Sequence, residues 1–257
     1  MLGAIVGDII GSVFEQTGTK TEDFPLFSED STFTDDTVQT CAVAKWLLDD
    51  EKRSPSSLVT IMQSLCKKHR WRGYSFQFSR WIKNPIPYNS YGNGSAMRVS
   101  PCGIVATKLE EAQWLAEISA SISHNHPEGI KGAVAVSSAI YLNKNGESKE
   151  YIKKYISDNF YSIPSLDAVR DSYKFDATCQ GSVPHALAAF YEGQTLEEVI
   201  RLSVSLGGDS DTIAAIASSI ASVGDMKVED SLSKECESRL TEDLLDIVRQ
   251  FENKYHV

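Results

Sequence analysis

Hydrophobic residues recur along this chain mostly at helical spacing. Leu115, Ile118 and Ile122 stand at positions i, i+3 and i+7, and residues 244–251 carry a complete apolar face. No hairpin dipeptide stands between alternating β-branched runs. The pattern therefore predicts a nearly all-helical fold. The expected helices run at about 2–14, 35–50, 56–70, 74–83, 94–107, 110–122, 127–143, 147–158, 181–192, 195–205, 210–223 and 240–254.

Three glycines in the first apolar run, Gly3, Gly7 and Gly11, stand four residues apart. On a helix this spacing makes a flat stripe that another helix can approach closely. Segments 15–33 and 84–94 are rich in turn-forming and polar residues and are predicted to be loops. Loops on a rigid helical frame commonly carry binding groups, so we expect functional residues near them.

Length and composition are ordinary for a globular protein, with 257 residues, 42% hydrophobic and 23% charged. No repeat or long Gly/Ser linker divides the chain, so we predict one compact domain over residues 1–257. The net charge of −10 disfavours duplex nucleic acid and anionic membranes as partners, because both are bound through clustered Lys and Arg. The five cysteines are scattered, which is typical of reduced thiols and not of a disulfide framework or a zinc site.

The first apolar run, from Leu2 to Phe14, has Asp8 in its middle and no basic region before it. It is too short to span a bilayer, and its composition does not fit a signal peptide. We therefore interpret it as a buried helix of the protein core and predict a cytoplasmic protein. No long apolar seam remains over the rest of the sequence, so we predict a monomer.

Two acidic motifs stand where a loop enters a helix of small and apolar residues. Residues 34–36 read Thr-Asp-Asp, and residues 207–212 read Gly-Gly-Asp-Ser-Asp-Thr. Each motif alone is compatible with an ordinary helix start, because Thr or Asp caps the first turn and acids favour the helix dipole. The two glycines allow a tight turn before the second motif.

Taken together, the two motifs favour a metal site. Each supplies two carboxylates and a threonine hydroxyl within four residues, which is more than a helix cap needs. Four carboxylates brought together would repel one another unless cations lay among them. A ligand set made only of oxygen suits magnesium or manganese better than zinc or copper. Two such ions about 3.5–4 Å apart would form a binuclear hydrolytic centre.

Five segments resemble, in order, the ADP-ribosylglycohydrolase family, which includes dinitrogenase reductase-activating glycohydrolase and the ADP-ribosyl-acceptor hydrolases. The resemblance covers about residues 1–224. It is specific because the five segments keep their order, whereas any one alone would be a weak signal. These segments are residues 3–15, 33–37, 92–98, 125–133 and 207–212.

The resemblance implies an all-helical fold with two magnesium or manganese ions. The implied metal ligands are Thr34, Asp35, Asp36, Asp209, Asp211 and Thr212, and all six are present. The acidic residue that the family carries near the end of its first helix falls on Glu15, and Asp8 is expected to be a polar buttress inside that helix.

The resemblance also implies which residues contact ADP-ribose. A glycine-rich loop that enters a helix can hold phosphate oxygens with its backbone N–H groups. His126 matches the family histidine near the pyrophosphate, whereas His124 has no implied role. Arg98 is compatible with either a structural ion pair or a phosphate contact. The implied substrate-binding residues are Gly92, Asn93, Gly94, Ser95, Met97 and His126.

The predicted reaction is hydrolysis of the glycosidic bond at the anomeric carbon of the distal ribose, through an oxocarbenium-like transition state. Glu15 and Asp36 are the candidate catalytic carboxylates, and Glu15 is preferred because Asp36 would be occupied by metal. Two alternatives stay open: a metal-dependent nucleotide phosphohydrolase, and an ADP-ribose-binding protein without activity. The sequence leaves the acceptor undecided among arginine, serine, a further ADP-ribose, a nucleobase and an acetyl ester.

Overall fold

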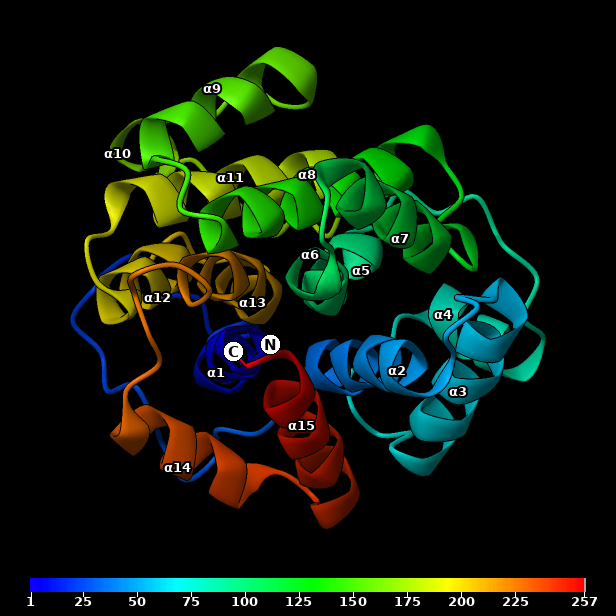
Figure 1. Ribbon diagram of the computed structural model, residues 1–257. Coiled ribbons are helices and arrows are strands. Elements are labelled where there is room, and N and C mark those ends of the chain that lie inside the picture. The colour runs from blue at the N-terminus through cyan, green and yellow to red at the C-terminus, as the bar shows by residue number, and fades with distance from the viewer. Residues whose placement is uncertain (257) are drawn as a thin grey trace.

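The computed structural model describes residues 1–256 and contains fifteen helices in that range (Figure 1). No strand occurs in the described part of the chain, where a single isolated bridge joins Gly92 and Thr178. The predicted all-helical fold is therefore confirmed. The helices are α1 Leu2–Gly11, α2 Asp35–Asp49, α3 Pro55–Lys68, α4 Phe76–Lys83, α5 Gly94–Met97, α6 Ser100–Val105, α7 Leu109–Ser121, α8 Pro127–Lys144, α9 Lys149–Asn159, α10 Leu166–Val169, α11 Cys179–Glu192, α12 Leu196–Val204, α13 Ser210–Ala221, α14 Asp230–Arg239 and α15 Glu242–Tyr255.

Several helix boundaries differ from the sequence-based prediction. Helix α1 ends at Gly11 and not at residue 14. The single helix predicted at 94–107 is wrong: it is divided into α5 and α6, since Pro101 has no N–H to donate to the carbonyl of Met97. Helices α10 and α14 were not predicted. The sequence of α14 has almost no apolar periodicity to reveal a helix, because only Cys236 of this helix is buried in the core.

Helix α1 is buried on all sides and packs along α13, at the middle of the molecule in Figure 1. The predicted glycine stripe faces α13. A Cβ at Gly7 would lie 2.3 Å from the carbonyl oxygen of Ala214, and a Cβ at Gly11 would lie 2.5 Å from the Cα of Asp211. The close approach therefore requires glycine at these positions. It also brings Asp8 of α1 beside the start of α13.

The other helices surround α1 and α13, and together they form one hydrophobic core (Figure 1). Helix α2 packs against α1, α3 and α15, and its first residues face the start of α13. Helices α7, α8 and α11 form a layer on one side, and α14 and α15 cover the other. This arrangement places the N-termini of α2 and α13 next to each other in the interior.

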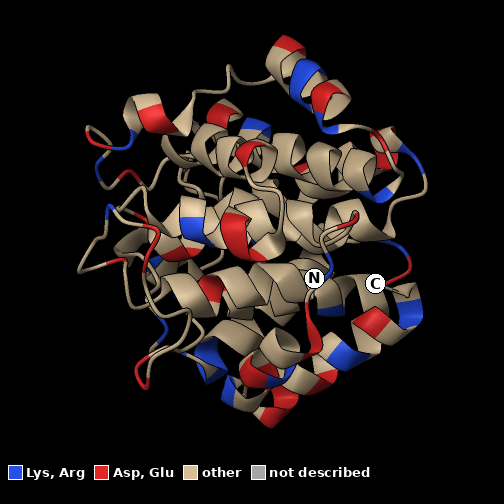
Figure 2. Cartoon of the chain, turned by 90° about the vertical axis from the view of Figure 1, so that its left-hand side faces the viewer, with Lys and Arg blue, Asp and Glu red and all other residues tan. Residues whose placement is uncertain are grey.

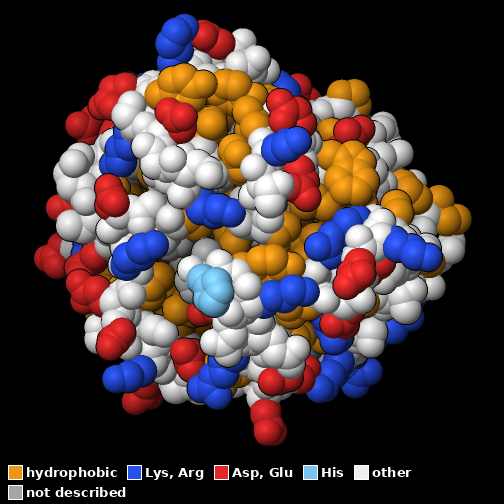
Figure 3. All heavy atoms as spheres, viewed as in Figure 1, with side chains coloured by type: hydrophobic (Ala, Val, Ile, Leu, Met, Phe, Trp, Pro, Cys, Tyr) orange, Lys and Arg blue, Asp and Glu red, His pale blue; other side chains and the backbone are white. Residues whose placement is uncertain are grey.

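Charged residues of both signs are dispersed over the outer helices and loops (Figure 2), and Figure 3 shows side chains of both charges mixed on the face viewed in Figure 1. All five cysteines are buried and free. None of the helices in the described range is long and apolar enough to cross a membrane.

Candidate active site

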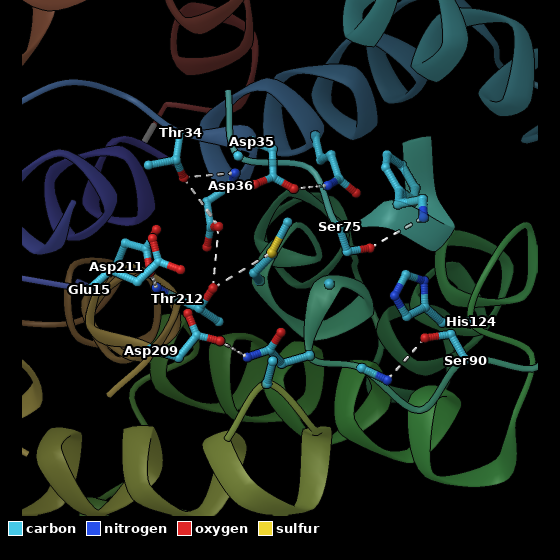
Figure 4. Close-up of a pocket in the computed structure, with 18 of the residues that line it drawn as sticks. Glu15, Thr34, Asp35, Asp36, Ser75, Ser90, His124, Asp209, Asp211 and Thr212 are labelled. Atoms are coloured by element: carbon cyan, nitrogen blue, oxygen red, sulfur yellow. Dashed lines mark hydrogen bonds between the residues drawn. The ribbon is translucent and has the colours of Figure 1, made fainter. Parts of the chain in front are cut away.

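A cavity of about 360 Å³ opens where the starts of α2 and α13 meet the start of α4, helix α5 and the loops that precede these two helices. Figure 4 shows Glu15, Asp36 and Asp211 on one side of it and Ser75, Ser90 and His124 on the opposite side. The cavity therefore has an acidic end and a neutral polar end. Its lining residues are Glu15, Thr34, Asp35, Asp36, Gln39, Gly73, Ser75, Phe78, Ser90, Gly92, Asn93, Gly94, Met97, His124, Phe175, Ala177, Asp209, Asp211 and Thr212.

The start of α2 is held by Asp8. Its carboxylate accepts hydrogen bonds from the backbone N–H of Thr34 at 3.0 Å and from the Thr34 hydroxyl at 2.7 Å. It also accepts from the backbone N–H of Thr37 at 3.1 Å and from the Thr37 hydroxyl. Thr34 caps the helix by accepting from the N–H of Asp36. Asp8 thus fixes how the first acidic motif points.

The start of α13 depends on two glycines with left-handed backbone, Gly207 at φ +58° and Gly208 at φ +140°. Residues that carry a Cβ rarely adopt these backbone conformations, so glycine is needed for the turn into the helix. The turn directs the second acidic motif at α2. The hydroxyl of Thr212 donates to Asp36 Oδ2 at 3.3 Å, which joins two motifs that stand 176 positions apart.

Two groups of carboxylates at the acidic end are close enough to share cations. Ligand oxygens lie within 4.8 Å of one another in the group Asp8, Asp36 and Asp211, and likewise in the group Glu15, Asp209 and Asp211. Asp36 Oδ1 is buried and has no hydrogen-bond partner among residues 1–256. A buried carboxylate oxygen without a partner is costly unless something else binds it. Because all the candidate ligand atoms are oxygens, these carboxylates fit a hard divalent cation.

The pKa values at the acidic end agree with this fit. Burial, followed by the nearby Asp8, raises the pKa of Asp35 to about 8. Burial also raises the pKa of Asp36 and Asp211 well above the ordinary range, and neighbouring carboxylates add to the effect. Carboxylates this crowded bind protons when no other cation is present. A metal ion would stabilise their charged forms.

Glu15 lies on the loop after α1 and is half-buried at the edge of the acidic end. Burial raises its pKa, and the charges of Asp209 and Asp8 raise it further. Its carboxylate makes no side-chain hydrogen bond within the described residues. It is therefore free to contact a bound molecule.

The glycine-rich loop connects the acidic end to the neutral end. Asn93 donates to Asp209 Oδ2 at 2.6 Å and to the Ser182 hydroxyl at 2.8 Å, so it holds one carboxylate in place. Gly92, Gly94 and Met97 line the cavity. The Ser95 side chain, by contrast, is fully buried and donates to the carbonyl of Gly129, so its hydroxyl does not face the cavity.

The two histidines of this region lie in different places. His126 caps α8 by accepting from the N–H of Glu128, its ring packs against Tyr91, and it is not among the residues that line the cavity. His124 lines the neutral end, and a Cβ at Gly94 would lie only 2.9 Å from its Nε2. The position of His126 directly before Pro127 is the sequence signal that could have separated the two roles.

Other lining residues had no role in the sequence-based prediction. Gln39 donates to Asp35 Oδ2 at 2.7 Å, and the i, i+4 spacing on α2 could have indicated this contact. Ser90 lies in the loop at 84–94, which was expected to carry binding groups, although the residue itself was not singled out. Ser75 caps α4, and Phe175 comes from a loop whose sequence carries no distinguishing pattern. Arg98 neither lines the cavity nor forms an ion pair among the described residues.

Comparisons with known proteins agree with this architecture. ADP-ribosylhydrolase ARH3 from Bos taurus is 24% identical over 326 aligned residues, covering 95% of this chain and 89% of that protein. ARH3 from Homo sapiens is also 24% identical, covering 95% and 90%. ADP-ribosylarginine hydrolase Tri1 from Pseudomonas putida (strain GB-1) is 27% identical over 154 residues, covering 55% of this chain and 40% of that protein.

A solved structure described as an ADP-ribosylglycohydrolase-related protein complex has a TM-score of 0.70 to this chain at 23% sequence identity. The likeness covers 96% of both chains and extends to the whole fold. The sequence model of the ADP-ribosylglycohydrolase family matches residues 1–255. The chain therefore belongs to the ADP-ribosylglycohydrolase family.

Proposed function

We propose that this protein hydrolyses the glycosidic bond between ADP-ribose and an acceptor, releasing ADP-ribose. The single observation that carries the proposal is the hydrogen bond from Thr212 to Asp36, through which both acidic motifs face one cavity. The family match and the names of the similar hydrolases support the same reaction class. The cavity has the volume expected of a small-molecule site.

Two magnesium or manganese ions are the cofactors that we propose for the acidic end. The residues that would hold them are Thr34, Asp35, Asp36, Asp209, Asp211 and Thr212. When bound, divalent cations supply Lewis acidity and lower the pKa of water toward neutrality. The buried, unpartnered Asp36 Oδ1 supports a ligand role for this residue. Asp8 would act behind it by fixing the backbone of α2.

The two ends of the cavity fit the two ends of the substrate. The distal ribose would lie at the acidic end, close to Glu15. The pyrophosphate would lie along Gly92–Gly94, where the backbone N–H of Gly94 and the ring of His124 would be the donors. The N–H groups of Gly92 and Asn93 already donate to the Ser90 hydroxyl oxygen and to the carbonyl of Ala177. We therefore propose His124 as a further substrate contact, whereas His126 would contribute by capping α8.

The proton transfers require a carboxylate near the anomeric carbon. Glu15 is the residue that we propose, because it is half-buried, has a raised pKa and is not committed to another side chain within residues 1–256. As positive charge develops on the ribose, the Glu15 carboxylate would accept a proton from the attacking water, or its protonated form would donate one to the leaving group. Asp36 is the alternative, but its ligand role would leave it less free.

Product analysis tests the proposed function. The purified protein is incubated with arginine-linked and serine-linked ADP-ribosyl peptides, with magnesium or manganese, and the products are separated. We expect free ADP-ribose and an unmodified acceptor. Release of AMP would instead identify a phosphohydrolase that cleaves the pyrophosphate. Binding of ADP-ribose without turnover on any linkage would contradict the enzymatic proposal.

A further inference from the structure

Arg98 is a fully buried cation directly behind the cavity wall. It follows Met97, which lines the cavity, at the end of α5. Its Nη1 donates to Gln39 Oε1 at 2.9 Å, and its Nη2 donates to the Ser123 hydroxyl oxygen at 2.9 Å and to the carbonyl of Ser119. One guanidinium thus reaches toward both ends of the cavity.

The contact with Ser123 determines the direction of the next hydrogen bond. A guanidinium only donates, so the Ser123 oxygen must accept from Arg98. The Ser123 hydroxyl hydrogen is then left to donate, and His124 Nδ1 lies 2.7 Å from that oxygen. If Nδ1 carried a proton instead, this fully buried hydroxyl would have no acceptor among the hydrogen bonds of the described residues. His124 Nδ1 therefore accepts.

An accepting Nδ1 places the ring proton of His124 on Nε2. That nitrogen lies beside Gly94 and faces the neutral end of the cavity. Burial, followed by the charge of Arg98, lowers the pKa of His124 well below its ordinary value, so the ring is neutral with one donor. The cavity therefore receives an N–H donor at this point.

The same reasoning applies at the acidic end. Because Gln39 Oε1 accepts from Arg98, the Gln39 amide nitrogen must face the other way, and it donates to Asp35 Oδ2 at 2.7 Å. The amide cannot flip without placing its NH₂ group against the guanidinium. Asp35 thus keeps a defined donor on one of its oxygens.

We propose that Arg98 is a positioning residue that fixes the hydrogen-bond direction at both ends of the cavity. Through Ser123 it presents His124 Nε2–H to an acceptor atom of the bound molecule, and through Gln39 it orients the Asp35 carboxylate. The identity of that acceptor atom, a phosphate oxygen of the substrate, rests on the proposed function. The ring tautomer and the amide orientation do not.

The tautomer is tested by nitrogen NMR of histidine rings in ¹⁵N-labelled protein at neutral pH, with His124 assigned from the His124→Gln variant. We expect the wild-type ring to be protonated at Nε2, and Ser123→Ala to give a mixture of both tautomers. Ser123→Thr should restore the single form. Ser119→Ala is the matched control, because Ser119 lies one turn earlier on α7 and its hydroxyl has no partner in the described structure. A wild-type ring protonated at Nδ1 would overturn the proposal.

The proposal has two arms: the contact through Ser123 to His124, and the contact through Gln39 to Asp35. Different measurements test each arm. Gln39→Met removes the donor to Asp35, and we expect Mn²⁺ binding measured by calorimetry to weaken about tenfold. Ser123→Ala should leave the Mn²⁺ dissociation constant unchanged but raise KM for an ADP-ribosyl peptide about tenfold. Arg98→Lys keeps the charge but cannot reach both partners, so it should show both defects. Unchanged Mn²⁺ binding in Gln39→Met would refute the arm at the acidic end.

These measurements keep the proposal distinct from the proposed function. If the protein turned over no ADP-ribosyl substrate, the ring tautomer and the Mn²⁺ affinities would still decide the role of Arg98. If Arg98→Lys did not fold, the Ser123 and Gln39 variants would each test one arm.

Discussion

The ammonium of Lys20 donates a hydrogen bond to the backbone carbonyl of Tyr173, 2.8 Å away. The same group donates to the carbonyls of Arg170 and Leu206. Lys20 lies on the loop that carries Glu15, whereas Leu206 directly precedes the Gly207–Gly208 turn. One side chain thus joins the Glu15 loop to the turn that positions the second acidic motif.

We therefore expect Lys20→Met to lower kcat/KM about tenfold, since losing hydrogen bonds to a charged group would loosen the Glu15 loop by roughly 1.4 kcal/mol. Lys144→Met is the matched control: Lys144 also donates to backbone carbonyls, those of Ile104 and Ala106, but these lie away from the cavity. Steady-state kinetics of both variants decide the matter. Equal losses in the two would show that the effect is only general destabilisation.

Divalent cations should stabilise the protein through the acidic end. At a concentration of 100 times Kd, a ligand stabilises by about 2.7 kcal/mol, which corresponds to a rise in Tm of roughly 5–10 °C for a chain of this size. Differential scanning fluorimetry with and without Mn²⁺ measures the shift.

The Asp211→Asn variant should remove the response to Mn²⁺ without lowering the Tm of the metal-free protein. Without metal it removes one buried carboxylate from a group of like charges, so we expect its Tm to equal or exceed that of the wild type. With Mn²⁺ the rise in Tm should be lost. A full Mn²⁺ response in Asp211→Asn would exclude Asp211 as a metal ligand.

Replacement of Glu15 by Gln should lower kcat by about 10²- to 10⁴-fold, the range typical of a lost general acid or base. The dissociation constant for ADP-ribose should change little, because the shape of the side chain is kept. Asp23→Asn provides a control with an exposed acid on the same loop. A kcat within twofold of the wild type would remove Glu15 from the proton transfers.

Asp243 should make the stability of the protein depend on pH. It bonds to Lys68 and to His69 Nε2, each at 2.9 Å, and so connects the start of α15 to the end of α3. Burial opposes ionisation, but these hydrogen bonds outweigh it and lower the pKa of Asp243. A lowered folded-state pKa contributes stability above the unfolded value, near 4, and that stability is lost as pH falls through the folded-state pKa.

Asp243→Asn should therefore reduce the free energy of unfolding by about 1–3 kcal/mol at pH 7, and the difference should shrink steadily below pH 4. Urea unfolding at several pH values measures this. Asp158→Asn, which removes an exposed i, i+4 pair with Lys154, should have no measurable effect. A difference that does not depend on pH would show that the Asp243 contact is not electrostatic.

Local patterns in the sequence predicted most of the helices and the all-oxygen composition of the acidic end. Helical periodicity depends on residues three or four positions apart, so it can be read without a structure. The glycine stripe on α1 predicted a close contact with another helix, and that helix is α13. The oxygen-rich motifs at 34–36 and 209–212 indicated a hard cation before their meeting was known.

The grouping of distant residues around one cavity, by contrast, follows from the packing of the helices. No local pattern relates Thr212 to Asp36, because their contact depends on how α1, α2 and α13 pack. The same holds for His124, which lines the cavity while His126 caps a helix two positions later. Arg98 is a further case, since its partners come from α2 and from the end of α7. Packing across long separations in sequence, and not the properties of neighbouring residues, fixes these contacts.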